Sequence, residues 1–541
     1  MPRIVVLDSI SQDGLDMLDA APGIEYEVIT GLKGDDLRNT LMQFDGAICR
    51  SGVKLTAEVL EGNTRLKAVA RAGVGTDNID KNMATRQGII VMNTPGGNTL
   101  STAEHALTLM LGLSRNVAPA NQSLIEGRWD RKLFMGSQLA GKTLGIIGLG
   151  RIGQAIALRA RALEMKLVGY DPFMSDALAE ELGIKLFHSV REMLPSCDYL
   201  TVHTPLTDET RGMISTEEIA LLPKGARLIN CARGGIYDEA ALVEGLKSGH
   251  LGGVALDVYP EEPCKANPLF GMPNTLCTPH LGASTEEAQT NVALEAVELL
   301  IDYFTTGTIK SAVNMAPMDG KTLAEMRGYL ALAWRLGLLA AQVEKGRVTK
   351  CTISYRGEIA SKTTSLVSGA LAAGLLSKAT GGESNIINAR MLLKERGIEL
   401  VEEKSNDRGT FSSLISVVIT SATGETRISG TLFGNTMPRL VQVNDYRLEA
   451  YLDGNLCLFL HDDVPGVIGQ VGNVFGACNV NIAQLSVGRA ACRDSGKALG
   501  VLGLDAVPTA EAIDAFGKIA GITTATFATL PAPNELPAWL A

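Results

Sequence analysis

Short apolar runs alternate with longer polar segments along the first 98 residues. The runs are Ile4–Leu7, Tyr26–Ile29, Ala47–Cys49, Ala68–Ala70 and Ile89–Met92, and the segments between them suit short helices. Because buried parallel strands are continuous apolar runs joined by helices, this rhythm predicts βα repeats on a parallel sheet. One long helix is expected next, over Thr99–Glu126, where apolar residues recur at helical spacing.

A second βα series begins at Thr143. Its six candidate strands are Leu144–Ile147, Leu167–Tyr170, Tyr199–His203, Arg227–Cys231, Gly253–Asp257 and Thr275–Cys277. Six strands joined in this way predict a complete doubly wound dinucleotide-binding domain. A helix from Thr285 to about Tyr303 is expected after it, followed by an irregular linker that runs through Lys310–Pro317.

The pattern changes in the last 220 or so residues. Residues 318–450 mix helical patterns, over Leu323–Glu344 and Ile386–Arg396, with a hairpin formed by Ser416–Ser421 and Arg427–Leu432. From Leu452 the order strand, helix, strand, strand, helix, strand predicts a small ferredoxin-like module. The predicted fold class is therefore α/β, with two doubly wound parallel-sheet domains, an α+β domain and a βαββαβ module.

Composition narrows the function classes. A chain of 541 residues is too long for one core, and its net charge of −10 disfavours nucleic acid as a main ligand. The nine cysteines show no metal-ligand spacing, so no metal is expected, and they suit a reducing compartment. The apolar stretch near Leu366–Leu376 is too short to span a bilayer, and the N-terminus starts as a strand. We expect a cytoplasmic protein without a membrane partner, or a plastid stromal one if a transit peptide has been removed.

A glycine-rich turn provides the first chemical signal. Gly148-Leu149-Gly150-Arg151-Ile152-Gly153 follows a candidate strand and opens a helix. In a dinucleotide site the first glycine permits the turn, the second lets the backbone approach the pyrophosphate, and the third lets helix and strand pack closely. Asp171 ends the next strand, where its carboxylate can accept hydrogen bonds from the ribose and would repel a 2′-phosphate. The predicted cofactor is NAD.

Three residues that suit hydride transfer follow strand ends. They are Arg233, Glu262 and His280. We expect His280 to act as general acid/base, Glu262 to orient its ring, and Arg233 to clamp a carboxylate with its planar guanidinium. Glu261 is adjacent to Glu262, so spacing alone leaves a choice between the two carboxylates.

These residues closely resemble the D-isomer-specific 2-hydroxyacid dehydrogenase family, over nearly all of the first 314 residues. The resemblance implies a substrate-binding domain from residues 1–98 and 293–314 and an NAD-binding domain from residues 99–292. Within the family, the segments Ala70–Asp80, Asn93–Asn98, Trp129–Gly136 and Pro279–Ser284 look like those of members that oxidise 3-phosphoglycerate, in the first step of serine synthesis.

The resemblance also implies site residues. Cofactor contacts are expected from the glycine-rich turn and Asp171, and from Thr204, Pro205, Cys231, Ala232, Asp257, His280, Gly282 and Ala283. Substrate contacts are expected from Arg50, Arg71, Gly73, Val74, Gly75, Asn98 and Arg131. Arg50 and Arg71 would hold the phosphate, Arg131 would reach the site from a second subunit, and Asn98 with the Gly73–Gly75 backbone would meet the carboxylate. Val74 stands where some members have a polar residue.

The C-terminal third resembles the long form of these enzymes, with an intervening domain at 318–450 and an ACT-type regulatory domain at 452–541. His461, Asp463 and Asn481 look like its effector-binding residues, which implies L-serine as an effector. The family also implies a homo-oligomer, either a dimer or a tetramer. Two alternatives remain open: a hydroxypyruvate or glyoxylate reductase (or another D-2-hydroxyacid dehydrogenase) on the same scaffold, and an NAD-sensing corepressor-like binding protein.

Overall fold

The N-terminal part of the chain folds around a five-stranded parallel sheet. The computed structural model describes every residue except 383, 408, 435, 491–495, 538 and 541. The strands are β1 (Arg3–Val6), β2 (Glu25–Val28), β3 (Gly46–Cys49), β4 (Ala68–Arg71) and β5 (Ile90–Asn93), in the order β2-β1-β3-β4-β5. The helices are α1 (Gln12–Asp19), α2 (Gly34–Leu41), α3 (Ala57–Leu60) and α4 (Lys81–Arg86). Each apolar run of the sequence is therefore a strand, as predicted.

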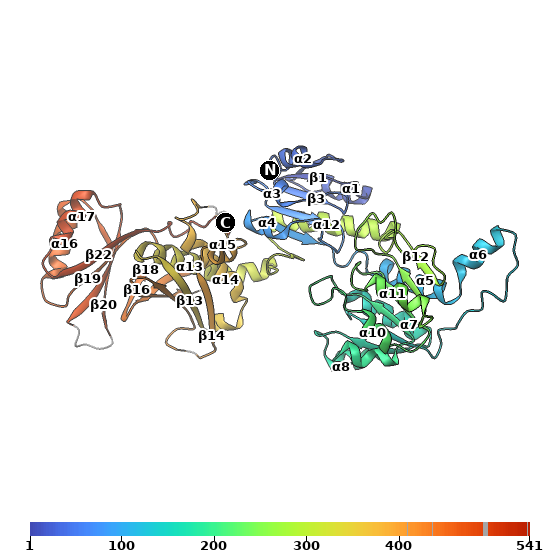
Figure 1. The fold of residues 1–541 in the computed structure, drawn as a ribbon. Coiled ribbons are helices and arrows are strands. Elements are labelled where there is room, and N and C mark those ends of the chain that lie inside the picture. The colour runs from blue at the N-terminus through green and yellow to red at the C-terminus, as the bar shows by residue number, and fades with distance from the viewer. Residues whose placement is uncertain (383, 408, 435, 491–495, 538, 541) are drawn as a thin grey trace.

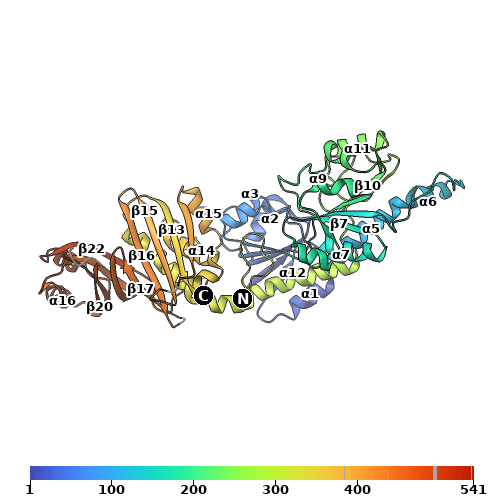
Figure 2. The same ribbon diagram turned by 90° about the horizontal axis from the view of Figure 1, so that it is seen from below.

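A helix from much later in the chain packs against the first sheet. Helix α12 (Glu286–Thr306) packs against α1 and β4, and its residues Val292, Ala296 and Leu300 belong to the same core as Ile4 and Val6 (Figure 2). After α12 the chain runs along the edge strand β5, where the N–H of Val313 donates to the carbonyl of Val91.

The second parallel sheet has seven strands rather than the predicted six. They are β6 (Thr143–Ile147), β7 (Lys166–Tyr170), β8 (Lys185–Leu186), β9 (Tyr199–Val202), β10 (Ala226–Asn230), β11 (Leu251–Leu256) and β12 (Thr275–Cys277). Their order, β12-β11-β10-β9-β6-β7-β8, places the chain reversal beside β6 and β9. The sequence missed β8 because two residues are too short to carry a period of two. The doubly wound fold itself is confirmed.

The expected single helix over Thr99–Glu126 is wrong. The chain forms α5 (Thr99–Ser114) and α6 (Val117–Ile125), separated at Asn116, whose φ of +52° is left-handed. Asparagine tolerates this conformation better than most residues, so the helix ends there without glycine. Helix α6 and the loop after it then project away from the second sheet (Figure 1).

The C-terminal strands form one continuous ten-stranded sheet. Strands β13 (Val348–Gly357), β14 (Glu399–Ser405), β15 (Ser413–Ser421), β16 (Gly424–Phe433), β17 (Met437–Val443) and β18 (Tyr446–Tyr451) make its first half, covered by α13 (Gly320–Val343), α14 (Thr364–Leu376) and α15 (Ala389–Glu395). The expected hairpin is β15 and β16.

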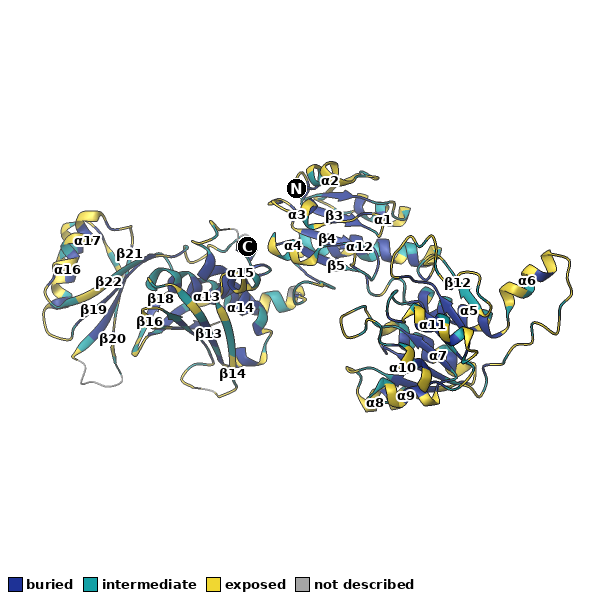
Figure 3. Cartoon of the chain, viewed as in Figure 1, coloured by how far each residue is buried: buried dark blue, intermediate teal, exposed yellow. Residues whose placement is uncertain are grey.

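The predicted βαββαβ module is present as β19 (Asn455–Asp462), α16 (Val467–Ala477), β20 (Ile482–Ala490), β21 (Lys497–Leu504), α17 (Ala510–Gly517) and β22 (Ile522–Thr529). Strand β18 pairs with β20 at Tyr446 with Ala490 and at Arg447 with Arg489, so the module shares its sheet with the strands before it. Figure 3 shows buried residues lining each of the three sheets, while α6 is largely exposed. Among the described residues, no helix is long and apolar enough to cross a membrane.

Candidate active site

The glycine-rich turn connects β6 to α7 (Arg151–Ala162) and has the geometry expected for a pyrophosphate. Gly148 has a φ of +89°, and a Cβ there would press on the carbonyl of His203. A Cβ at Gly153 would overlap the carbonyl oxygen of Gly148, so this glycine is needed for close packing. Around Gly150, by contrast, a Cβ would meet nothing within 4 Å, and this open side faces the helix start. A phosphate there would lie at the positive end of α7.

Asp171 is held by the same turn. One carboxylate oxygen accepts the N–H of Leu149 at 2.8 Å, and the other accepts the N–H of Phe173 at 2.8 Å. Each oxygen keeps a lone pair, so the carboxylate can still accept ribose hydroxyl groups. The side chain therefore has a fixed direction at the end of β7.

The loop after β9 faces this turn with unused polar atoms. The hydroxyl of Thr204 and Nδ1 of His203 are buried without a hydrogen-bond partner, while Nε2 of His203 lies 2.8 Å from the hydroxyl of Thr201. Buried polar groups are nearly always satisfied in a complete site. Orphaned atoms beside an open glycine turn fit a dinucleotide, which agrees with NAD as the cofactor.

His280 and Glu262 form the pair predicted from the sequence. Nδ1 of His280 lies 2.5 Å from Glu262 Oε2, and Glu262 Oε1 accepts the N–H of Tyr259 at 3.0 Å. Burial acts to raise the pKa of Glu262, but hydrogen bonds from His280 and Tyr259 outweigh it and lower this pKa. The carboxylate is ionised at neutral pH and keeps the Nδ1–H tautomer, so Nε2 is free to act as a base. The choice between Glu261 and Glu262 is thus decided for Glu262.

Arg233 connects the two parallel sheets. It lies after β10, its Nε donates to Asp77 at 3.0 Å, and its Nη1 donates to the carbonyl of Ala232 at 2.6 Å. Asp77 follows β4 of the first sheet. A Cβ at Gly75 would overlap the guanidinium of Arg233, so glycine is required for this approach. The sequence analysis did not single out Asp77, although an acidic residue shortly after the end of a predicted strand was a signal that could have marked it.

A second arginine lies beside the first. Arg71 ends β4, its Nε is buried without a partner, and its guanidinium lies where a Cβ of Gly73 would be. Burial lowers the pKa of Arg71, and the charges of Arg233 and Arg50 act in the same direction, against Cys49 and Asp77. Positive charges in mutual proximity are stabilised by an anion. Arg50 lines a cavity of about 620 Å³ together with Ser284 and Thr285, which precede α12, and the first residues of that helix.

Several residues expected to meet a substrate carboxylate lie between β4 and α5. The N–H of Gly73 donates to the hydroxyl of Thr94 at 2.6 Å, so this donor is already engaged, and its expected contact with a carboxylate stays a prediction. Val74 and Gly75 remain as backbone candidates, and the carbonyl of Val74 accepts from Asn93. Asn98 precedes α5, and its amide oxygen is buried without a partner.

Asp257 binds the turn that carries His280. Its side chain is 0% exposed, and its oxygens accept from Thr278, Leu281 and Gly282 and lie 3.2 Å from Nε2 of His105. In this arrangement the carboxylate holds the turn that carries His280, and its expected contact with the nicotinamide stays a prediction. Neither His105 nor Thr278 was singled out from the sequence, because each resembles an ordinary polar residue there. Cys231 and Ala232 directly precede Arg233, and Pro205, Gly282 and Ala283 lie in the loops beside Thr204 and His280.

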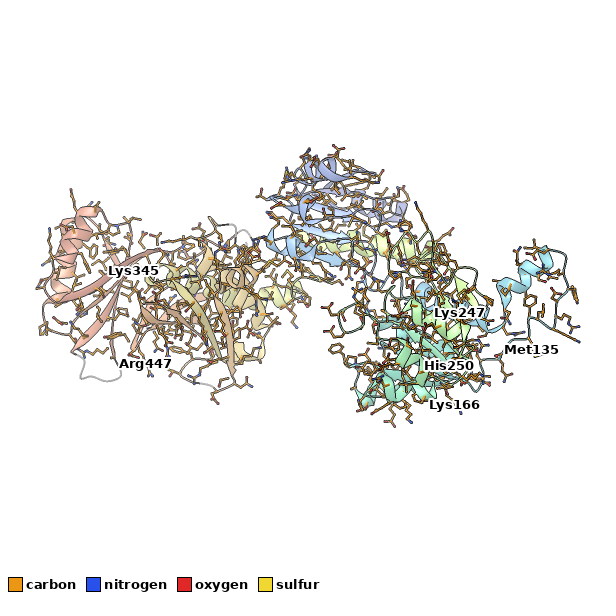
Figure 4. All side chains as sticks on the ribbon, viewed as in Figure 1. Met135, Lys166, Lys247, His250, Lys345 and Arg447 are labelled. Atoms are coloured by element: carbon orange, nitrogen blue, oxygen red, sulfur yellow. The ribbon has the colours of Figure 1, made fainter. Side chains whose placement is uncertain are left out.

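Arg131 lies on the projecting loop that follows α6. Met135 marks this loop in Figure 4, away from the two sheets. Large apolar side chains on α6 and the loop are exposed by 56 to 83%: Val117, Leu124, Ile125, Trp129, Leu133 and Met135. We name these six residues the apolar arm.

The expected effector residues are engaged by other groups of this chain. His461 is 2% exposed and stacks on Phe459 with ring centroids 5.3 Å apart, and its expected contact with an effector stays a prediction. Asp463 accepts from Nε of Arg489 at 2.6 Å, and Asn481 donates to Asp505 at 2.6 Å. The ion pair with Arg489 lowers the pKa of Asp463. Among the described residues, no group of three or more His, Cys, Asp or Glu side chains is placed to hold a metal ion.

Two doubly wound sheets, an NAD turn and a His–Glu pair beside an arginine define a dehydrogenase of the two-domain nicotinamide class. Residues 107–282 match the family described as D-isomer specific 2-hydroxyacid dehydrogenase, NAD binding domain, and residues 325–444 match the D-3-phosphoglycerate dehydrogenase intervening domain. The D-3-phosphoglycerate dehydrogenase of Archaeoglobus fulgidus is 40% identical over 529 residues, 98% of this chain and 100% of the relative. That of Bacillus subtilis is 41% identical over 505 residues, 93% of this chain and 95% of the relative.

Solved structures agree over more than half of the chain. The NAD⁺-bound 3-phosphoglycerate dehydrogenase of Entamoeba histolytica is 31% identical, with a TM-score of 0.50 over 58% of this chain and 99% of its own. A glyoxylate reductase from Paecilomyes thermophila is 28% identical, with a TM-score of 0.54 over 58% and 98%. This chain belongs to the D-isomer specific 2-hydroxyacid dehydrogenases and, within them, to the D-3-phosphoglycerate dehydrogenase family.

Proposed function

We propose that this protein oxidises C2 of 3-phospho-D-glycerate to 3-phosphohydroxypyruvate with NAD, the first step of serine synthesis. The observation that carries the proposal is the His280–Glu262 pair beside Arg233, next to the further arginines Arg71 and Arg50. A substrate with a carboxylate at one end and a phosphate at the other has two anionic groups for these guanidinium groups. The domain division is proposed as expected from the sequence, with the site between residues 1–98 and 99–292.

The proton transfers follow from the tautomer of His280. Its Nε2 takes the proton of the C2 hydroxyl, and the resulting imidazolium is stabilised by Glu262 through Nδ1–H. Arg233 binds the carboxylate and the C2 oxygen, which draws it away from Asp77. The glycine turn and Asp171 would hold NAD, which would supply the acceptor for the hydride that leaves C2. The orphaned groups of Thr204 and His203 face that turn and are available to hydrogen-bond the cofactor.

A substrate test separates phosphate recognition from catalysis. NADH formation would be followed with NAD and either 3-phosphoglycerate or D-glycerate, in the wild type and in Arg71→Gln. We expect a preference for the phosphorylated acid that falls at least tenfold in the variant, because a charge-assisted contact with the phosphate is lost. Arg65→Gln is the control, since Arg65 pairs with Asp45 on the outer surface. Equal turnover of both acids by the wild type would contradict the substrate assignment and favour a reductase of glyoxylate or hydroxypyruvate.

The catalytic assignment has its own test. His280→Gln should lower kcat by about a thousandfold, because both the base and the imidazolium partner of Glu262 are removed. Glu262→Gln should lower kcat by a smaller factor and shift the acid limb of the kcat profile to lower pH, because the neutral amide no longer stabilises the imidazolium form, which must lose its proton before it can act as a base. Both effects are read from pH profiles of kcat with 3-phosphoglycerate. Near-normal turnover in His280→Gln would rule out the assigned base.

We also propose a homo-oligomer built through the apolar arm. Six large apolar side chains on a projecting element form a surface that a partner subunit covers. The same contact would bring Arg131 to the partner's site. Trp129→Ser with Leu133→Ser should shift the wild-type oligomer toward monomer in analytical ultracentrifugation, whereas Phe173→Ser, at an equally exposed site outside the arm, should not. An unchanged mass in the double variant would argue against this interface.

L-serine remains the proposed effector, with its ammonium near Asp463 and its carboxylate near Arg489 and Asn481. The ion pair between Asp463 and Arg489 would be exchanged for contacts with the amino acid. Calorimetric titration of the full-length protein with L-serine and D-serine tests this directly. Binding of the L form that is lost in Asp463→Asn supports the site, and absence of heat with the wild type counts against it.

A further inference from the structure

We propose that His105 is a positioning residue, which sets the turn that carries His280 by fixing the buried carboxylate of Asp257. The proposal rests on the proposed function only for the choice of substrate. His105 lies on α5, the helix that leads from Asn98 into the second sheet, and it does not touch the Glu262 pair. Its Nε2 lies 3.2 Å from Asp257 Oδ1 and 3.1 Å from the hydroxyl of Thr278.

Asp257 accepts hydrogen bonds from residues on both sides of His280. Its Oδ1 accepts the hydroxyl of Thr278 at 2.6 Å and the N–H of Leu281 at 2.7 Å, and Oδ2 accepts the N–H of Gly282 at 2.8 Å. These donors flank His280 in the sequence. Burial alone would raise the pKa of Asp257, but the hydrogen bonds from His105, Thr278 and Leu281 together lower it. The carboxylate is therefore charged, and its direction decides where the turn lies.

The turn needs this support because His280 has a φ of +56°. A left-handed conformation of a residue other than glycine costs about 1–2 kcal/mol and persists only where its surroundings enforce it. Two neighbouring N–H groups bound to one carboxylate provide that enforcement. Thr102, also on α5, donates to the carbonyl of Gly282 at 3.2 Å, so the helix contacts the turn at a second point.

Among the described residues, His105 is the donor to Asp257 that comes from α5, whereas Thr278, Leu281 and Gly282 all follow β12. Nε2–H is shared between Asp257 and Thr278, since Thr278 gives its own proton to the carboxylate. Without this donor the buried carboxylate loses part of its compensation and gains room to rotate, and the Leu281–Gly282 N–H groups follow it. A shift of the turn moves Nε2 of His280 away from the substrate hydroxyl, which lowers turnover more than binding.

The test compares two substitutions of His105 in the full-length protein. His105→Leu removes the donor, and His105→Gln keeps an amide donor close to the position of Nε2. At saturating NAD we expect kcat with 3-phosphoglycerate to fall about tenfold in the Leu variant, with KM for 3-phosphoglycerate within twofold, and to recover to within threefold in the Gln variant. Thr108→Val is the control on the same helix, because Thr108 is exposed and bonds only the Glu104 carbonyl of its own turn.

A second experiment distinguishes positioning of His280 from a general effect on the stability of the fold. In a His280→Gln background, His105→Leu should change the residual rate less than twofold, because the group that it positions is already absent. A tenfold loss in that background, an unchanged kcat in the single variant, or equal losses in the Leu and Gln variants would each overturn the proposal. If the wild type does not oxidise 3-phosphoglycerate, the proposed function fails instead, and the same variants are compared with the 2-hydroxy acid that it does oxidise.

Discussion

At the scale of single residues, the site depends on polar groups in unusual environments. His203 is the clearest case. Burial lowers its pKa to about 3, so the folded protein keeps this imidazole neutral where the unfolded chain, with a pKa near 6.5, binds a proton. Because the unfolded state takes up more protons below that value, stability is full above pH 6.5 and is lost as the pH falls toward 3.

The neutral state of buried His203 predicts how stability depends on pH. Between pH 7 and pH 5 the wild type should lose on the order of 1 kcal/mol of unfolding free energy to His203, a value reduced because the residue keeps some exposure. His203→Gln should lose less over the same interval, as measured by urea unfolding at both pH values. His188→Gln is the control, since its side chain is 79% exposed. Equal acid sensitivity of the wild type and His203→Gln would show that His203 is protonated in the folded state.

At the scale of elements, two helices of the intervening region cross at a pair of glycines. Gly337 of α13 faces the backbone of α14, and a Cβ there would overlap the carbonyl oxygen of Leu371 and lie 2.8 Å from the nitrogen of Leu375. Gly374 of α14 reciprocally faces Trp334 and Leu338. Without side chains at these positions the helix axes approach closely, and their flanking apolar residues share one core.

Gly337→Ala should therefore destabilise the protein by about 2 kcal/mol or more, although alanine is the better helix former, because the two helices must separate. The control is Gly472→Ala on α16, where a Cβ would meet nothing within 4 Å. That change should leave stability unchanged or raise it by up to about 1 kcal/mol. Thermal unfolding of both variants tests this pair of predictions. A gain of stability in both would mean that α13 and α14 have room for a methyl group at Gly337.

At the scale of the whole molecule, one buried arginine joins distant parts of the C-terminal half. Arg335 of α13 is 1% exposed and donates to five carbonyls, those of Leu452, Pro531, Ala532, Pro533 and Glu535. It thereby ties the helix to the start of the last module and to the chain after β22. Trp539 from the same terminal segment packs edge-on against Trp334, with ring centroids 6.5 Å apart.

Arg335→Met should release this terminal segment and cost about 3–5 kcal/mol, because several carbonyls lose their donor inside the protein. The measurements are hydrogen exchange of residues 530–537 and tryptophan emission, which should shift to longer wavelength as Trp539 leaves its contact. Arg327→Met, an exposed position on the same helix, is the control. Unchanged exchange in Arg335→Met would show that the segment is held by its apolar contacts alone.

Sequence patterns and tertiary structure decided different parts of this protein. Continuous apolar runs predicted all five strands of the first sheet and six of the seven in the second, because most of these strands are buried on both faces and are therefore rich in apolar residues. The glycine-rich motif predicted the NAD turn, and the positions of His280, Glu262 and Arg233 after strand ends predicted that they lie close together, because parallel strands end at one edge of a sheet.

Local sequence patterns could not predict contacts between distant segments. Asp77 reaches Arg233 across 156 positions, and Arg335 binds carbonyls nearly 200 positions away, neither of which leaves a local period. The burial of His461 was missed for the same reason, since it depends on what packs against this residue. The break at Asn116 and the two-residue strand β8 were missed because a single left-handed residue and so short a strand leave no periodic pattern. Local pattern therefore determined the elements and the types of chemical group, whereas the fold alone decided which of those groups meet, because their encounter is set by packing between segments and not by sequence distance.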